Sequence, residues 1–209
     1  MLSPDKGIET VIKALPDLAA RHPNLLYVVL GATHPHLVKH EGEAYRERLQ
    51  AMARDLGVAD HIEFLDEFVA HEALLDRLQA ADVYVTPYRN PAQVTSGTLS
   101  YAVGVGKAVV ATPYVHASEI LADGHGLLVD FDDSAGFAAA IGDLLAEPAE
   151  RAALSERAYL RGRSMIWDRN AESVMTALTS ARAARTVRLP RPAAMAPLTP
   201  SFAAIERMS

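Results

Sequence analysis

The chain of 209 residues contains no cysteine. This excludes disulfide bonds, thiolate zinc sites and cysteine nucleophiles, and it is compatible with a reducing compartment. No apolar run approaches the roughly 20 residues needed to cross a bilayer. The first residues, MLSPDK, turn polar at once and do not form a signal peptide. We therefore expect a cytoplasmic protein without a membrane span.

Positive charge is also scarce, because 20 lysines and arginines face 26 acidic residues and give a formal net charge of -6. Such a chain has no general attraction for nucleic acid, so we expect no nucleic-acid partner. Histidines gather at His34, His36 and His40, but a metal site needs further ligands that only a suitable loop conformation would supply. A solvated loop is the favoured interpretation, and no metal or other cofactor is expected.

What the chain does contain is short β-branched apolar runs that alternate with segments of helical spacing. Half of its residues are hydrophobic, which is a globular composition. Near-continuous apolar strands between helices are typical of a parallel sheet covered on both faces. The sequence therefore predicts an α/β fold, a doubly wound Rossmann-like parallel sheet. The strands are expected at residues 26–31, 62–65, 83–87, 108–112 and 126–129.

The last third of the chain reads as helical. Asp133 or Ser134 can cap a helix that runs to about residue 146, Pro148 opens a second, and a third is expected over 171–184. Four prolines between residues 190 and 200 then indicate a linker. We predict one Rossmann-like domain over residues 1–185, with C-terminal helices, and a proline-rich linker or tail over 186–209.

The stretch that carries the most chemistry is residues 87–102, just beyond the end of a predicted strand, where ligands bind in open α/β sheets. Thr95 or Ser96 can cap a helix that begins near Gly97. Free backbone N–H groups at such a helix start favour an anion, and a glycine lets a phosphate approach closely. Spacing alone leaves two interpretations open, an anion site and a well-capped turn without a ligand.

A second candidate is Lys6, which precedes a predicted helix at the edge of the sheet. A flexible ammonium there could reach a phosphate as a point charge. Taken by itself, a lysine at a helix start is more often a solvated surface residue.

Four segments together resemble the C-terminal domain of the retaining family-4 glycosyltransferases, which have the GT-B fold. LSPDKG at 2–7 is similar to the family's opening turn, and AADVYVTP at 80–87 to one of its strands. GKAVVAT at 106–112 and EILADGHGLLV at 119–129 match two further motifs. The resemblance covers roughly residues 2–184 in the family's order, and its specificity comes from the four motifs jointly.

The resemblance implies a donor site for a nucleotide-diphospho-sugar. The lysine that matches Lys6 contacts the donor diphosphate in that family, and the nucleotide base lies near the backbone that matches Phe64 and Leu65. Amides of a glycine-rich turn bind the same phosphates. In this chain that turn is made of Thr95, Ser96, Gly97, Thr98 and Leu99.

Two positions depart from the family pattern. Its pair of glutamates, eight positions apart, falls on Gln93 and Tyr101. The resemblance places Gln93 at the catalytic position beside the donor sugar and Tyr101 near the ribose. Gln93 can exchange hydrogen bonds with a sugar, but it carries no charge to stabilise an oxocarbenium ion.

The resemblance also implies a partner, an N-terminal acceptor domain, because GT-B enzymes bind their two substrates between two such domains. Only Leu2 and Ser3 precede Pro4 where the family has an opening strand, so we expect that strand to be clipped and the chain to be inactive alone. The expected reaction is hexosyl transfer to an acceptor hydroxyl. Two alternatives stay open, a non-catalytic binding or scaffolding module and another two-domain nucleotide-sugar enzyme such as an epimerase.

Overall fold

The computed structural model describes residues 1–184, and the chain divides into two compact units. The first comprises Met1–Ile166, and the second begins at Trp167. The described part of the second unit is a single helix, α9 (Trp167–Ala184), whose residues are exposed along its whole length. The features discussed below all belong to the first unit.

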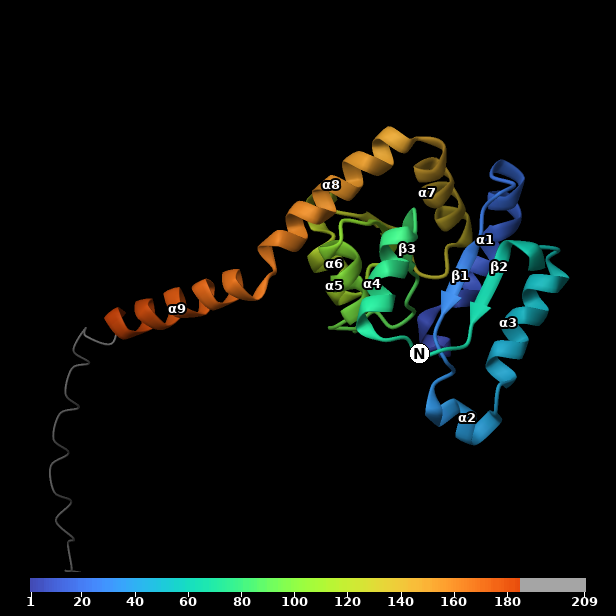
Figure 1. Ribbon diagram of the computed structural model, residues 1–209, viewed down its shortest axis with the longest axis horizontal. Coiled ribbons are helices and arrows are strands. Elements are labelled where there is room, and N and C mark those ends of the chain that lie inside the picture. Colours follow the sequence, from blue (N-terminus) through green and yellow to red (C-terminus); the bar gives the residue numbers. More distant parts are fainter. Residues whose placement is uncertain (185–209) are drawn as a thin grey trace, which may run out of the picture. The chain divides into compact units, whose positions relative to one another are not determined.

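Parallel strands form the centre of the first unit (Figure 1). β1 (Tyr27–Leu30) pairs with β2 (Ile62–Leu65), and β4 (Ala108–Ala111) pairs with both β3 (Val83–Thr86) and β5 (Leu127–Leu128). All pairings are parallel, as predicted from the apolar runs. The strands form two separate hydrogen-bonded ladders, β1-β2 and β3-β4-β5, because no pairing joins β1 to β3.

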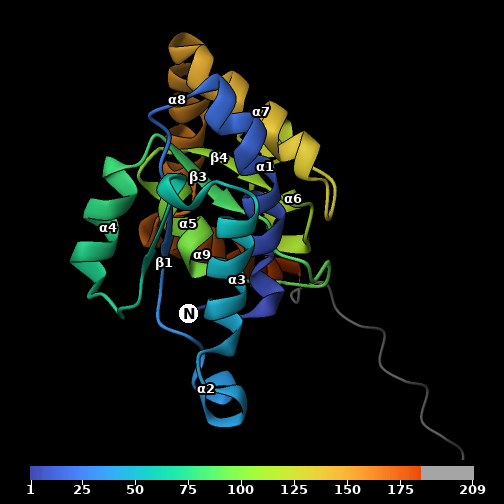
Figure 2. The ribbon, with the colours of Figure 1, turned by 90° about the vertical axis from the view of Figure 1, so that its right-hand side faces the viewer.

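Helices occupy the segments between and after the strands. α1 and α7 pack against each other (Figure 2), and an Arg21–Asp143 ion pair of 2.8 Å joins their ends. The helices of the first unit are α1 (Ile8–Arg21), α2 (Pro35–Glu41), α3 (Ala44–Asp55), α4 (His71–Ala80), α5 (Gly97–Gly104), α6 (Val115–Ile120), α7 (Ser134–Ala146) and α8 (Pro148–Ser164).

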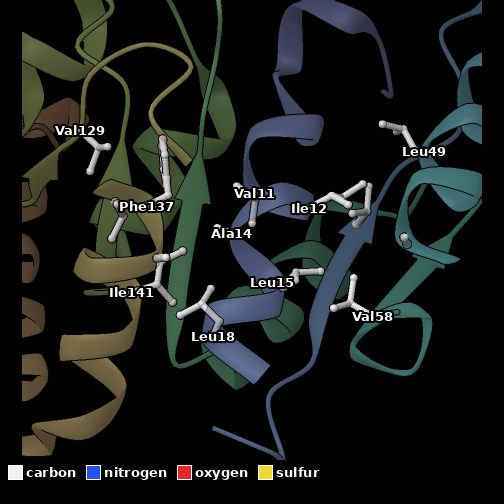
Figure 3. Packing of buried hydrophobic residues seen from close by; sticks show 14 of the residues in the cluster. Val11, Ile12, Ala14, Leu15, Leu18, Leu49, Val58, Val129, Phe137 and Ile141 are labelled. Atoms are coloured by element: carbon white, nitrogen blue, oxygen red, sulfur yellow. The ribbon is translucent and has the colours of Figure 1, made fainter. Parts of the chain in front are cut away.

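The larger hydrophobic core lies around α1. Apolar residues at helical spacing on α1 meet the inner face of α7 (Figure 3), and burial of such side chains stabilises the fold by about 1.5–3 kcal/mol each. A second core of smaller size forms where α5 and α6 cover β4. The labelled side chains that meet between α1 and α7 are Val11, Ala14, Leu18, Phe137 and Ile141.

The close packing of α5 on α8 depends on the glycine at position 162. A methyl group added to Gly162 would lie 2.8 Å from the Cα atom of Gly104, which is too close for ordinary contact. Arg163 of α8 also donates a hydrogen bond of 3.0 Å to the carbonyl oxygen of Gly104. This approach fixes α5, and therefore its N-terminal turn, against the body of the domain.

One predicted helix cap is confirmed, and several other features differ from the sequence predictions. Asp133 is confirmed as the cap of α7, because its side chain accepts a 2.8 Å hydrogen bond from the Gly136 amide. The histidine-rich segment, predicted as a loop, contains the short helix α2, and α6 was not predicted. α9 begins at Trp167, a turn earlier than expected. The predicted linker over 186–209 lies outside the described residues, and so does residue 185.

Candidate functional site

The segment 2–7 lies across the C-terminal ends of both ladders. The Leu2 amide donates a hydrogen bond of 2.8 Å to the carbonyl oxygen of Ala32, just beyond β1. On the other side, the Arg89 amide, just beyond β3, donates one of 3.0 Å to the carbonyl oxygen of Asp5. Gly7 has a φ of 63°, and a methyl group there would overlap the carbonyl oxygen of Pro87. Glycine is therefore required for this close approach.

The predicted anion-binding turn forms the start of α5. Ser96 is the N-cap, and its Oγ accepts a hydrogen bond of 3.4 Å from the Leu99 amide. Leu99 is fully buried, whereas the position above Gly97 is open space. The Tyr84 hydroxyl donates a 2.7 Å bond to the hydroxyl of Thr98. Buried contacts of Thr98 and Leu99 therefore hold the turn in place, while the space beside Gly97 is free for a ligand.

Lys6 lies beside this turn. Its Nζ is 3.8 Å from the centroid of the Tyr88 ring, a cation–π contact. The Tyr88 hydroxyl lies 3.5 Å from the Ser96 Oγ, and its ring stacks on Tyr114 at 5.0 Å. The Lys6 ammonium is therefore held near the positive end of the α5 dipole, and two like charges that converge in this way favour an anion between them.

The same cluster changes the acidity of a phenol. Burial by itself raises the pKa of Tyr88, but hydrogen bonds with Ser96, Lys6 and Thr98 and the charge of Lys6 together outweigh it, so that the pKa is lowered. Tyr88 and Lys6 line one cavity of about 1280 Å³ with four residues of the turn, namely Thr95, Ser96, Gly97 and Thr98.

His116 holds the turn from the side and was not predicted from the sequence. Its Nδ1 accepts a 2.8 Å hydrogen bond from the Ser96 amide, and its own amide donates to the carbonyl oxygen of Gln93 at 3.1 Å. Burial lowers the pKa of His116 more than the nearby Glu119 carboxylate raises it. The ring is thus kept in the neutral form, which alone can accept this bond.

The two positions that depart from the family pattern lie on either side of the turn. Gln93 bonds within its own loop, since its Nε2 donates a 2.6 Å hydrogen bond to the carbonyl oxygen of Thr95. Tyr101 lines the cavity with a side chain 40% exposed, and its ring meets His71 edge to face at 4.8 Å. Both side chains are within the neighbourhood of the turn, but only Tyr101 contributes to the cavity wall.

The two residues expected near a nucleotide base lie on β2 and point to opposite faces. Leu65 lines the cavity, and its carbonyl oxygen accepts a 2.9 Å bond from the Gly31 amide. Phe64 packs against the larger core instead. This alternation is the ordinary consequence of a strand's period of two.

Beyond β1 and β2 lies a buried arginine that sequence reasoning also missed. Arg46 is 6% exposed and donates to the carbonyl oxygen of Gly31 at 3.0 Å and to Asp66 at 2.6 Å. It also pairs with Glu43 at 3.2 Å. Its long-range partners carry no sequence spacing that could have revealed them. Arg46 fixes the loops that follow the two strands.

Two classes of feature are not found within residues 1–184. No group of three or more histidine and acidic side chains there is placed to hold a metal ion, and the rings of His36 and His40 simply contact each other at 4.4 Å. Over the same range, no helix has the length and apolar character needed to cross a bilayer.

Comparison with known proteins identifies the family. The sequence profile described as glycosyl transferases group 1 matches residues 1–161. This chain belongs to that family. A mannosyltransferase of Mycolicibacterium smegmatis, named as GDP-mannose-dependent and acting on phosphatidylinositol monomannoside, is 36% identical over 73% of this chain and 39% of its own length. A D-inositol 3-phosphate glycosyltransferase of Acidothermus cellulolyticus is 32% identical over 90% of this chain and 42% of its own length.

Solved structures show the same fold. The C-terminal domain of a group 1 glycosyl transferase from Francisella tularensis matches 78% of this chain and 81% of that domain, with a TM-score of 0.68 and 19% identity. Anabaena HepE in complex with UDP and glucose matches 86% of this chain and 46% of that protein, with a TM-score of 0.71 and 22% identity. The glycosyltransferase chain described here spans about two fifths of the length of the curated relatives it matches.

Proposed function

We propose that this chain is the donor-binding half of a retaining GT-B hexosyltransferase and holds a nucleotide-diphospho-sugar. The observation that carries the proposal is the convergence of the Lys6 ammonium and the N-terminus of α5 on one cavity. Family membership supports a transferase. The transfer of a hexosyl group to an acceptor hydroxyl would use a second domain of the GT-B type.

The chemistry follows from where negative charge develops. Departure of the nucleoside diphosphate leaves charge on its phosphate oxygens, and preorganised donors at that place lower the barrier. Lys6 supplies a point charge, and the amides after Ser96 supply hydrogen bonds aligned with the helix dipole. Gln93 would contact the donor sugar once its bond to Thr95 is exchanged. Leu65, which lines the same cavity, would lie near the base.

The test is calorimetry with GDP, UDP and ADP on the chain as it exists. We expect weak binding of at least one of them, because one domain supplies only half of a cleft. Lys6→Ala should weaken that binding by about 1.5–3 kcal/mol, or roughly 10–150-fold, by removing a charge-assisted contact. Lys39→Ala is the matched control, since Lys39 is exposed and lies outside the cavity wall.

Two results would contradict the proposal. The first is no heat with any of the three nucleotides at millimolar concentration on a folded sample. The second is equal loss of affinity in the Lys6 and Lys39 variants, which would indicate attraction by net charge alone. A third result would favour the alternative of a non-catalytic nucleotide-sugar module, in which Gln93 and Tyr101 replace the glutamate pair. In that case the two-domain protein would bind the nucleotide normally but would transfer no sugar.

A further inference from the structure

The hydroxyl of Tyr88 belongs to a chain of hydrogen bonds that ends at the cavity. The Leu99 amide donates to the Ser96 Oγ at 3.4 Å, and the Ser96 hydroxyl in turn donates to the phenol oxygen of Tyr88 at 3.5 Å. Tyr88 is therefore the acceptor in this contact, which leaves its own hydroxyl hydrogen unused. Because Tyr88 lines the cavity, that hydrogen is available to a ligand there.

Two other phenols near the turn use their hydroxyls within the fold. The Tyr84 hydroxyl donates to the hydroxyl of Thr98 at 2.7 Å, and the Tyr114 hydroxyl shares a bond of 3.2 Å with that of Thr86. Within residues 1–184, by contrast, no hydrogen bond is found in which the Tyr88 hydroxyl is the donor. Tyr88 is thus the phenol of this group that can still donate to a ligand.

Three contacts hold Tyr88 in place without involving that hydrogen. Its ring stacks on the ring of Tyr114, with 5.0 Å between centroids and 20° between planes. The Nζ atom of Lys6 lies 3.8 Å from the ring centroid, and the Thr112 hydroxyl donates to the Tyr88 carbonyl oxygen. A side chain that is already ordered loses little conformational entropy when a ligand binds to it.

The positive charge of Lys6 is not balanced by a carboxylate in the described part of the chain. None of the ion pairs within residues 1–184 includes Lys6, and its ammonium contacts the Tyr88 ring instead. The phenol oxygen of the same ring contacts Ser96, the N-cap of α5. An anion attracted by Lys6 and by the helix dipole therefore lies beside the Tyr88 hydroxyl.

We propose that Tyr88 is a phosphate-binding residue, whose hydroxyl donates a hydrogen bond to a diphosphate held between Lys6 and the start of α5. This role rests on the proposed nucleotide-binding function. It adds a third kind of donor, a phenol, to the ammonium and the backbone amides already described. Because the phenol must carry its hydrogen to donate, the contact is lost when Tyr88 ionises.

The acidity of Tyr88 makes this contact sensitive to alkaline pH. The pKa of Tyr88 is lowered, so the phenol ionises below the ordinary value of about 10. A phenolate has no hydrogen to donate and repels a phosphate, whereas a bound anion favours the protonated phenol. Nucleotide affinity should therefore be highest below the lowered pKa and should decrease as the pH rises through it.

The titratable groups around Tyr88 do not produce the same dependence. Burial is the main cause that raises the pKa of Tyr84 and that of Tyr114, the latter to about 12, so both phenols ionise at higher pH than Tyr88. Burial lowers the pKa of His116, so this ring is neutral throughout the alkaline range. Lys6 is the cation that contacts the ring, and it is present in both proteins compared below.

The test compares the unaltered chain with Tyr88→Phe, which keeps an aromatic ring and removes only the hydroxyl. Calorimetry with GDP, UDP, ADP and inorganic pyrophosphate is carried out at pH 7 and at pH 9.5. At pH 7 the variant should bind about 10–150-fold more weakly, the factor expected for a hydrogen bond to a charged group, and the difference should shrink at pH 9.5. Tyr159→Phe is the matched control, because Tyr159 is 46% exposed and lies outside the cavity wall.

A spectroscopic titration reports on the phenol itself. Phenolate absorbance is followed with rising pH, with and without pyrophosphate, and the difference between the unaltered chain and Tyr88→Phe isolates the ionisation of Tyr88. Pyrophosphate should move this ionisation to higher pH, because the bound anion favours the protonated phenol. A ring that only shapes the site would show no such shift.

The outcomes separate this role from the proposed function. If Tyr88→Phe binds as tightly as the unaltered chain at pH 7 while Lys6→Ala binds more weakly, the role of Tyr88 is wrong and the proposed function stands. The role is also wrong if the loss is equal at both pH values and pyrophosphate does not move the ionisation of Tyr88. Absence of binding of all four compounds would contradict the proposed function, and the role of Tyr88 with it.

Discussion

At the scale of single residues, the turn before α5 depends on a hydrogen bond that the neutral ring of His116 accepts. The Ser96 amide donates a hydrogen bond to the Nδ1 atom of His116. In a protonated ring Nδ1 carries a hydrogen and cannot accept this bond. Protonation of His116 should therefore release the turn that we propose as the phosphate site.

The pH dependence follows from the lowered pKa of His116. As the pH falls below about 6.5, the ordinary pKa of histidine, the unfolded chain takes up a proton while the native ring stays neutral. The free energy of unfolding should then decrease with falling pH until the lower native pKa is passed. His116→Gln keeps an acceptor without titrating, so chemical denaturation between pH 7.5 and 5.5 should show a flatter profile for this variant. If the stability of the His116→Gln variant depended on pH as steeply as that of the unaltered chain, this prediction would be wrong.

Gln93 gives a second prediction at the same scale, for the complete enzyme that contains this chain. Its amide can contact a donor sugar only by exchanging the bond to Thr95. We expect Gln93→Ala to lower the turnover number clearly and to leave nucleoside diphosphate affinity nearly unchanged, because the phosphate contacts lie elsewhere. Steady-state kinetics and calorimetry measure the two quantities. Unchanged turnover would show that this position has no part in the chemistry.

At the scale of elements, the contact between α5 and α8 predicts opposite effects for two facing glycines. Alanine at Gly162 gains about 0.5–1 kcal/mol of helix propensity, but its methyl group meets the backbone of Gly104 at 2.8 Å. Overpacking costs about 1–3 kcal/mol, so the net effect should be destabilising. Alanine at Gly104 meets nothing within 4 Å and should be neutral or stabilising. Urea unfolding of the two alanine variants measures this difference. Equal unfolding midpoints for the two variants would refute the packing argument.

Elements with a strong apolar pattern were predictable from the sequence. The five strands appear where β-branched runs occur, and α7 begins at the expected Asp133 cap. The six-residue helix α6 was missed, since it is too short to show a period and is fixed by burial of Ala117 and Ile120. Tertiary packing, which no local pattern encodes, decides such segments.

The candidate site was predictable in part. Ser96 caps α5, one of the two caps that the spacing allowed, and Lys6 lies near it because the ends of parallel strands meet at one edge. The supporting contacts of Tyr88, His116 and Arg46 could not be predicted, because each joins loops that only the complete fold brings together. The roles of the donor-site residues remain predictions that the Lys6 and Gln93 variants test.

At the scale of the whole molecule, we expect the isolated chain to fold and to transfer no sugar. Its two cores are extensive, but rate enhancement requires both substrates in near-attack geometry, and the expected acceptor side belongs to another domain. The assay incubates the chain with nucleotide-sugars and simple acceptors and follows release of nucleoside diphosphate. Glycoside formation at about 1 per second or faster, a rate of ordinary enzymes, would show that this chain builds a complete site.

The pairing of α1 with α7 has a consequence for synthesis on the ribosome. The two residues of the Arg21–Asp143 ion pair are separated by 122 positions. At about 5–20 residues per second, roughly 6–24 s pass between the emergence of one and the other. During that interval the apolar stripe of α1 has no α7 to cover it, so the nascent chain offers chaperones a binding segment on α1. Release of that segment would coincide with the arrival of α7.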